Sequence, residues 1–236
     1  MSARARSFGS AADAYARGRP SYPEDAVRFV LPRVPCSVVD VGAGTGKLTE
    51  VLVRLGCEAV AVEPDAEMRA RIEGCDARAG VAEALPLPDC SVDAVVAGQA
   101  SHWFELTRFV DEAVRVLRPG GTVGLLRNVQ DDRVGWVAEL AELTGQGALA
   151  SVEVDMPFRD DRFEQAELLE VPHSQPMSLS LLVDRVASSS RTIVQPSERR
   201  TALLARVEEF GRRHFGEDTF DFPLLTRAWR YRRRSA

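Results

Sequence analysis

The chain has 236 residues, of which 45% are hydrophobic and 28% are charged, so it is long enough to bury one substantial core. Its 30 basic and 35 acidic residues give a net charge of −5 with neutral histidines, which disfavours general binding to a nucleic-acid backbone. No uncharged run approaches the roughly eighteen apolar residues that a membrane-spanning helix needs, and the first residues lack the apolar segment of a secretory signal. We therefore expect a cytoplasmic protein that binds neither membrane nor nucleic acid.

The N-terminal segment precedes the first expected strand and contains two short helical patterns. Residues 10–17 can form one helix, residues 18–20 break it, and Pro23 opens another with acidic residues in its first turn. These helices need a surface to lie on. We expect residues 1–34 to form a helical lid over the mouth of a sheet.

Short apolar runs alternate with segments of helical period up to residue 128, which is typical of strand–helix–strand units with parallel strands. The expected strands are residues 37–41, 58–62, 78–80, 92–97 and 122–126. The helices between them are expected at 47–55, after the capping residue Asp65, and at 105–117. Beyond Asn128 the alternation stops. We expect helices at 133–144, 180–188 and 197–214, and extended strands at 166–177 and 220–231.

The four cysteines are far apart in the sequence, so neither a zinc site nor a disulfide framework is expected, and we expect no metal site at all. Each cysteine instead comes just before an expected strand: they are Cys36, Cys57, Cys75 and Cys90. In a doubly wound sheet this places them at the edge opposite the ligand crevice. A catalytic thiol is therefore not expected.

A glycine-rich turn joins the first strand to the next helix in the run Val39-Asp40-Val41-Gly42-Ala43-Gly44-Thr45-Gly46. Such a turn lets the backbone approach a ligand closely. Glu63 falls at the end of the second strand, where a carboxylate can accept hydrogen bonds from both hydroxyls of an adenosine ribose. Turn and acid together suit either a dinucleotide or S-adenosylmethionine. Only Thr45 separates the last two glycines, whereas the dinucleotide fingerprint has two residues there.

Over nearly its whole length the chain resembles the class I S-adenosylmethionine-dependent methyltransferases of the type 11 methyltransferase domain family. The motifs are Asp40 to Gly46, Glu63 with Pro64 and Met68, Gly80-Val81-Ala82-Glu83-Ala84-Leu85-Pro86, and Val116-Leu117-Arg118-Pro119-Gly120-Gly121. Two further runs, Tyr15 to Pro23 and Gly98 to Phe104, resemble a bacterial small-molecule subgroup that includes relatives of the trans-aconitate-type enzymes.

The resemblance implies a Rossmann-like α/β fold with a seven-stranded sheet of order 3-2-1-4-5-7-6, in which strand 7 is antiparallel. It implies one methyltransferase domain over 1–236, with the lid at 1–34, the cofactor-binding core at 35–128, and a helix-rich region with a closing strand pair at 129–236. The implied cofactor is S-adenosyl-L-methionine, and the implied partner is a small-molecule acceptor.

The residues expected to bind the cofactor are Tyr15, Arg19, Asp40, Gly42, Ala43, Gly44, Gly46, Glu63, Pro64, Met68, Ala82, Glu83 and Gln99. Arg19 suits the carboxylate of the methionyl group, and Met68 either covers the adenine or faces the core. One departure concerns Val81, because many relatives carry an aspartate there that receives the adenine amino group. The backbone at Val81, or Glu83, must then make that contact.

Methyl transfer from a sulfonium is an in-line displacement, so the protein mainly aligns the acceptor and excludes water. An acceptor hydroxyl or ammonium also needs a base, and His102 is the candidate, because it follows the fourth strand and histidine titrates near neutral pH. The alternative is that His102 and Trp103 only pack beneath the lid. We interpret His173 and His214 as structural. The acceptor pocket is expected to use the lid and residues 101–108 and 128–149.

Two other functions use the same features. An NAD(P)-dependent oxidoreductase shares the glycine turn and the acid, and a non-catalytic S-adenosylmethionine-binding protein would keep the cofactor site without turning over. The arginines between Arg227 and Arg234 are interpreted as a solvated end of the chain rather than a nucleic-acid contact.

Overall fold

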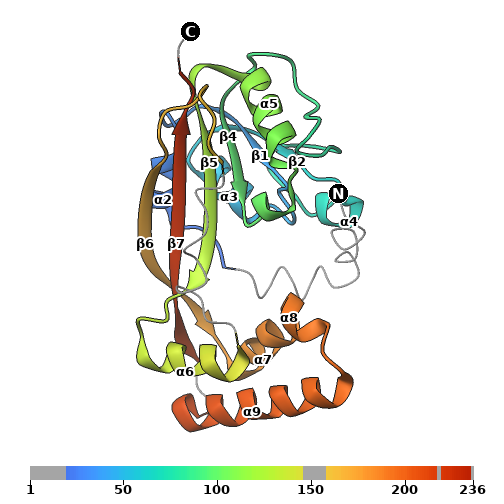
Figure 1. Ribbon diagram of the computed structural model, residues 1–236, viewed down its shortest axis with the longest axis vertical. Helices are drawn as coiled ribbons and strands as arrows, with labels where there is room; N and C mark the ends of the chain where they lie inside the picture. The colour runs from blue at the N-terminus through green and yellow to red at the C-terminus, as the bar shows by residue number, and fades with distance from the viewer. Residues whose placement is uncertain (1–19, 146–157, 217–218, 235–236) are drawn as a thin grey trace.

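A computed structural model describes residues 20–145, 158–216 and 219–234. Its sheet has seven strands in the order β3-β2-β1-β4-β5-β7-β6 (Figure 1). The strands are β1 Ser37–Val41, β2 Glu58–Val62, β3 Asp76–Arg78, β4 Val92–Gly98, β5 Leu117–Gln130, β6 Glu167–Met177 and β7 Phe220–Arg232. Strand β7 is antiparallel to both β5 and β6, whereas the other pairs are parallel. This confirms the fold, the strand order and the direction of strand 7.

The described helices connect the strands or extend beyond them. They are α2 Glu24–Val30, α3 Lys47–Arg54, α4 Ala66–Arg69, the 3-10 helix η3 Ser101–Trp103, α5 Leu106–Val116, α6 Gly135–Thr144, α7 Leu179–Ala187, α8 Ser190–Ile193 and α9 Ser197–Phe215. None of them is long and apolar enough to cross a membrane.

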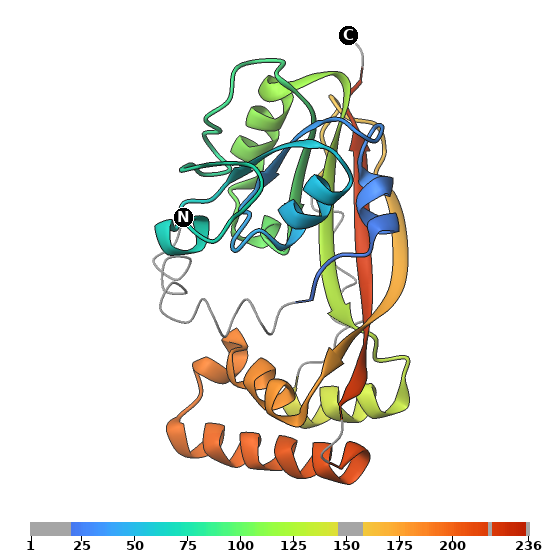
Figure 2. The same ribbon diagram turned by 180° about the vertical axis from the view of Figure 1, so that it is seen from behind.

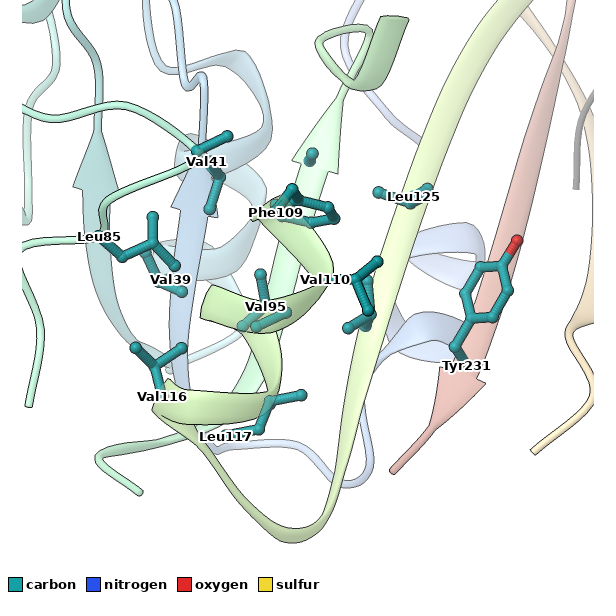
Figure 3. Packing of buried hydrophobic residues seen from close by; sticks show 14 of the residues in the cluster. Val39, Val41, Leu85, Val95, Phe109, Val110, Val116, Leu117, Leu125 and Tyr231 are labelled. Atoms are coloured by element: carbon teal, nitrogen blue, oxygen red, sulfur yellow. The ribbon is translucent and has the colours of Figure 1, made fainter. Parts of the chain in front are cut away.

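Helix α5 covers one face of the sheet with its apolar side (Figure 3). Phe109, Ala113 and Val116 recur at helical spacing and are fully buried. They pack with Val95 of β4 and Leu125 of β5, whose neighbours in the strands point to the opposite face. This packing fixes the carboxyl end of β4, from which the chain enters η3.

Helices α2 and α3 cover the opposite face. A Cβ atom at Gly124 of β5 would lie 2.5 Å from Cβ of Val30, so only glycine lets α2 approach this closely. The Thr122 hydroxyl also donates to the carbonyl of Val30 at 2.8 Å. This part of the expected lid therefore lies on the face of the sheet rather than over its mouth, and residues 1–19 lie outside the described residues.

Most boundaries lie within two residues of the sequence-based expectation, and β3 and β5 differ in ways that matter for the fold. Strand β3 spans Asp76–Arg78, two residues earlier than expected, and β5 starts directly after α5 rather than at Thr122. Leu117 pairs with Val92 and Thr122 pairs with Ala94, so residues 118–121 bulge out of β5. The Pro-Gly-Gly sequence thus forms an irregularity inside a strand, with Gly120 at a φ of 74°.

Beyond one end of β5, β6 and β7, helices α6, α7, α8 and α9 form a separate group (Figures 1 and 2). Helices α6, α7 and α9 have a core of their own with Met177 of β6 and with Phe222 and Leu224 of β7. The long antiparallel strands thus connect this helical group to the part of the sheet that carries the glycine turn.

The four cysteines precede β1, β2, β3 and β4, as expected. Cys36 and Cys57 are buried next to one another, and burial, helped by the neighbouring Cys57, raises the pKa of the Cys36 thiol to about 12. Such a thiol stays protonated at neutral pH.

Candidate active site

A cavity of about 260 Å³ lies at the carboxyl ends of β1, β2 and β4. The lining residues come from the segment 20–128 and from Ser188. The cavity lining includes Tyr22, Asp40, Gly42, Ala43, Gly44, Glu63, Pro64, Met68, Val81, Ala82, Gln99, His102, Asn128 and Ser188. Of the residues expected to bind the cofactor, Gly46 and Glu83 do not line this cavity, and Tyr15 and Arg19 lie outside the described residues.

The glycine turn is held against the end of β2. The backbone N–H groups of Gly42 and Ala43 both donate to the carbonyl of Val62, at 2.8 and 3.2 Å. Gly42, Gly44 and Gly46 all have positive φ, and a Cβ at Gly42 would lie 2.7 Å from Cβ of Ala100. Glycine is therefore required at Gly42 both for the backbone conformation and for the close approach. Gly46 is the N-terminal cap of α3.

Glu63 is buried directly after β2, and its carboxylate links the glycine turn to the backbone ahead of α4. Its Oε2 accepts from the N–H of Gly44 at 2.8 Å, and its Oε1 accepts from the N–H of Asp65 at 2.9 Å. Each oxygen keeps one lone-pair direction for a ligand. Burial raises the pKa of this carboxyl, although both backbone N–H groups oppose that rise. Ligand hydroxyl donors would favour the charged form.

Asp40 is fully buried below the turn, and only one of its two carboxylate oxygens accepts a hydrogen bond in the described structure. Its Oδ2 accepts from the Thr49 hydroxyl at 2.7 Å, whereas its Oδ1 has no hydrogen-bond partner among the described residues. Burial raises the pKa of Asp40 to about 7, the Thr49 hydrogen bond opposes this, and the nearby Glu63 carboxylate raises it further. Two acids at one end of a cavity favour a ligand that carries positive charge and hydroxyl donors.

Met68 and the loop after β3 form another side of the cavity. Asp65 caps α4 by accepting from the N–H groups of Glu67 and Met68, as expected, and this places the buried Met68 on the cavity wall. Val81 and Ala82 line the cavity as well. The carboxylate of Glu83 instead accepts from the N–H of Glu105 at 2.9 Å.

Gln99 stands at the end of β4 with a φ of 56°, a conformation that non-glycine residues rarely adopt. Its N–H donates to Leu126, and its side-chain Nε2 donates to the carbonyl of Asn128 at 2.6 Å. These two hydrogen bonds fix the backbone of Gln99 at the cavity and stabilise its unfavourable positive φ. Gln99 and His102 also line a second cavity on the side away from the glycine turn.

A buried polar chain connects Asn128 to His173 of β6. Thr226 Oγ1 donates to Asn128 Oδ1 at 2.5 Å and lies 3.0 Å from His173 Nε2. Because the Thr226 hydroxyl has only one proton, His173 Nε2 must be the donor. Burial lowers the pKa of His173, so the neutral ring fits this role. His173 lines neither cavity, in agreement with a structural role.

His102 belongs to η3 and is exposed at the cavity mouth, with its ring centroid 4.7 Å from that of Trp103. The sequence-based expectation placed Tyr22 and Asn128 only within the longer segments 1–34 and 128–149 of the acceptor pocket, and it did not include Ser188. A Cβ at Gly98 would lie 2.5 Å from the Tyr22 hydroxyl oxygen, so the glycine leaves room for this ring at the end of β4. Ser188, between α7 and α8, carried no sequence signal, since only the tertiary fold brings it there.

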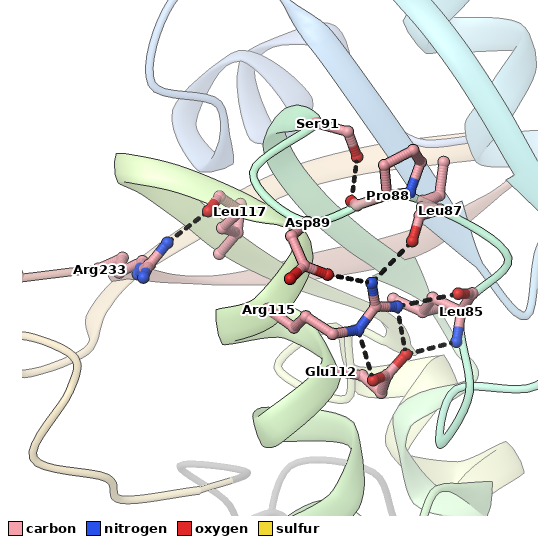
Figure 4. Close-up of polar contacts among 9 residues, drawn as sticks. All are labelled: Leu85, Leu87, Pro88, Asp89, Ser91, Glu112, Arg115, Leu117 and Arg233. Carbon is pink, nitrogen blue, oxygen red and sulfur yellow. Dashed lines mark hydrogen bonds and ion pairs between the residues drawn. The ribbon is translucent and has the colours of Figure 1, made fainter.

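Arg115 of α5 holds the loop that follows the lining residues Val81 and Ala82 (Figure 4). Its guanidinium donates to the carbonyls of Leu85 and Leu87 at 3.0 and 2.7 Å and forms a bidentate ion pair with Glu112. Glu112 in turn accepts from the N–H of Leu85 at 2.7 Å. One side chain thus satisfies several backbone groups of the cavity wall.

We expect Arg115→Met to destabilise the fold by about 2 kcal/mol, because Glu112 and two carbonyls lose their donor. Arg115 lowers the pKa of Glu112, so the wild-type protein loses this stabilisation as the pH falls through that lowered pKa, and the variant does not. Urea unfolding at several pH values measures both effects. Arg108→Met on the same helix is the control, since its ion pair with Glu105 is exposed and 3.5 Å long. Equal losses in the two variants would contradict the anchoring role.

Within the described ranges, no group of three histidine, cysteine, aspartate or glutamate side chains is placed to hold a metal ion.

Comparison with known proteins identifies the family. Residues 39–125 match the family model described as a methyltransferase domain. An uncharacterised methyltransferase of Mycobacterium tuberculosis is 45% identical over 208 residues, which cover 86% of this chain and 84% of the relative. An uncharacterised methyltransferase of Schizosaccharomyces pombe is 28% identical over 95% of this chain and 96% of its own length.

Solved structures agree with this match. A candidate type II methyltransferase from Anaeromyxobacter dehalogenans superposes with a TM-score of 0.64 at 25% identity, over 92% of this chain and 97% of the other. A candidate methyltransferase from an antibiotic biosynthesis pathway of Anabaena variabilis has the same fold, with a TM-score of 0.60 at 21% identity over 87% and 95% of the two chains. The family match, the relatives and the shared fold agree: this chain belongs to the class I methyltransferases that use S-adenosylmethionine.

Proposed function

We propose that this methyltransferase acts on a small-molecule acceptor by in-line transfer, with the cofactor in the larger cavity and the acceptor approaching across Gln99 and His102. The observation that carries the proposal is that these two residues line both the larger cavity and a second, smaller one. Two adjoining concave sites of this size suit a cofactor and a small acceptor molecule. The trans-aconitate-type subgroup remains a prediction from the sequence.

The residues of the larger cavity fit S-adenosylmethionine. The orphaned Asp40 Oδ1 is a buried acceptor suited to the cationic amino group, and the Glu63 carboxylate has lone pairs left for two ribose hydroxyls. Met68, Pro64 and the backbone of Val81 and Ala82 supply the wall for the adenine. When bound, the cofactor supplies an activated methyl group.

Beyond binding the cofactor, the protein must align the acceptor atom with the methyl group. Gln99 is fixed by its bonds to Leu126 and Asn128, so the wall against which the acceptor lies is rigid. His102 borders both cavities and is placed to receive a proton from an acceptor hydroxyl or ammonium. A carboxylate acceptor would need no such base.

Two measurements test the proposal. Calorimetric titration with S-adenosylmethionine, S-adenosylhomocysteine and NAD should show binding of the two adenosyl ligands only. Methyl-labelled cofactor incubated with a fractionated cell extract should then label the ultrafiltrate that holds small molecules. Label in the retained protein or nucleic acid, with none in the ultrafiltrate, would overturn the small-molecule assignment.

A further inference from the structure

Asn128, near the end of β5, lines the larger cavity and bonds to three distant parts of the chain. Its side-chain Nδ2 donates to the carbonyl of Ser21 at 3.1 Å. Its backbone carbonyl accepts from Gln99 Nε2 at 2.6 Å, and its Oδ1 accepts from the Thr226 hydroxyl at 2.5 Å. One residue thus connects the N-terminal segment, the end of β4 and β7 at the wall of the cavity.

Pro20 and Tyr22, on either side of Ser21, both line the larger cavity as well. Tyr22 is buried with its ring against Gly98 of β4, whereas Ser21 is exposed. The hydrogen bond from Asn128 therefore fixes the backbone of this short segment at a point where Ser21 contributes no buried side chain.

The order of donors and acceptors decides which end of the Asn128 amide faces Ser21. A backbone carbonyl only accepts, so the amide presents its NH₂ group to Ser21 and its oxygen to Thr226. The Thr226 hydroxyl gives its one proton to that oxygen and accepts from His173 Nε2 at 3.0 Å. Thr226 and His173 thus orient the amide, although they line neither of the two cavities.

This chain of polar groups lies where apolar side chains would fill the sheet at lower cost. Thr226 is fully buried and Asn128 is buried, so each must replace its lost contacts with water by hydrogen bonds within the protein. A fully satisfied chain of this kind specifies one arrangement of its members. The arrangement specified here is the one that points an N–H donor at Ser21.

We propose that His173 and Thr226 are positioning residues for cofactor binding. Through Asn128 they hold residues 20–22 against the larger cavity, and this part of the wall slows the departure of a bound cofactor. The inference rests on the proposed function, which places the cofactor in that cavity. It adds a set of residues that control how long the cofactor stays bound.

Stopped-flow mixing with S-adenosylhomocysteine measures the association and dissociation rates. The signal is tryptophan fluorescence, to which Trp103 on the cavity wall contributes. Thr226→Val replaces the hydroxyl by a methyl group, so the Asn128 amide loses its donor and can turn toward the cavity. We expect dissociation to become about fivefold faster or more, the effect of losing one buried hydrogen bond. Thr226→Ser keeps the hydroxyl and should retain the wild-type rate.

Thr122→Val is the matched control. Thr122 is fully buried on the same strand and the same face as Asn128, and its hydroxyl also donates to a backbone carbonyl, that of Val30. Both valine variants should lose similar stability in urea, because each loses one buried hydroxyl. Only Thr226→Val should release S-adenosylhomocysteine faster, which a purely structural role would not predict.

Asn128→Asp tests the orientation of the amide. The carboxylate still accepts from Thr226, but it presents an oxygen instead of an NH₂ group to the Ser21 carbonyl. We expect dissociation at least as fast as in Thr226→Val. Hydrogen exchange around Tyr22, measured with S-adenosylhomocysteine bound, should rise in both variants and not in Thr122→Val.

A wild-type dissociation rate in Thr226→Val or in Asn128→Asp would overturn the inference, as would equal rates in Thr226→Val and Thr122→Val. These results would leave the proposed function intact. Methyl label that enters macromolecules would instead overturn the proposed function without changing any of these rates.

Discussion

Replacing Glu63 by alanine is expected to weaken binding of S-adenosylhomocysteine by about a hundredfold or more. The change removes the proposed acceptor of two ribose hydroxyls, and hydrogen bonds to a charged group contribute about 1.5–3 kcal/mol each. It also frees the N–H of Gly44, so the glycine turn loses its anchor to the end of β2. Calorimetric titration of the wild-type and variant proteins measures the difference.

Glu63→Gln separates these two contributions. The amide keeps the size of the side chain, but one of its ends must place an NH₂ group against a backbone N–H donor. We expect an intermediate loss of affinity and a fold that is retained on thermal unfolding. Glu67→Gln on the exposed side of α4 serves as the matched control. Wild-type affinity in a folded Glu63→Ala protein would remove Glu63 from the cofactor site.

Asp40→Asn is expected to stabilise the protein without ligand and to weaken cofactor binding. A carboxyl whose pKa is raised by burial favours the fold in its protonated form, so its contribution is complete below the ordinary pKa and is lost as the pH rises toward about 7. Between the ordinary value of 3.8 and about 7, the lost stability amounts to about 4 kcal/mol. The neutral amide avoids this loss, so the gain of the variant should grow from pH 5 to about pH 7 and then level off.

Unfolding by urea across that pH range measures the gain, with Asp25→Asn on the surface of α2 as the control. Cofactor binding provides a second test. If Asp40 pairs with the cationic amino group, its pKa falls on binding, and the wild-type protein releases protons near pH 6.5. Calorimetry in buffers of different ionisation enthalpy should detect this release in the wild-type protein and not in the variant. A stability gain that does not depend on pH would refute this account of Asp40.

The structure of the cofactor-binding core could be predicted from the sequence, because its turns, helix caps and strand ends depend on residues that are close together in the chain. The turn at Gly42 to Gly46 needs positive φ, Asp65 caps the next helix, and Glu63 ends a strand, and each of these can be identified within a few residues. The boundary of β5 could not be predicted. Pro119 and Gly120 normally end an element, whereas here the pairing of Leu117 with Val92 holds them inside a strand.

The acceptor side depends instead on contacts between distant parts of the chain. Ser188 and Arg127 reach their cavities only after β7 has paired with β5 and the helical group has packed, and no periodic pattern marks either residue. The motif around Glu83 likewise gave no indication that its carboxylate accepts a hydrogen bond from the N–H of Glu105.

The position of β7 between β5 and β6 has a consequence for synthesis on the ribosome. Both neighbours of β7 precede it in the chain, so they leave the exit tunnel before the strand that pairs with them. Until β7 emerges, the hydrogen-bonding edge of β5 from Thr122 to Gln130 has no partner, and the helices around Leu182 and Val207 lack Phe222 and Leu224. An open strand edge beside an incomplete apolar core is prone to aggregation. We therefore expect the nascent chain to be most prone to aggregation in the interval before β7 emerges.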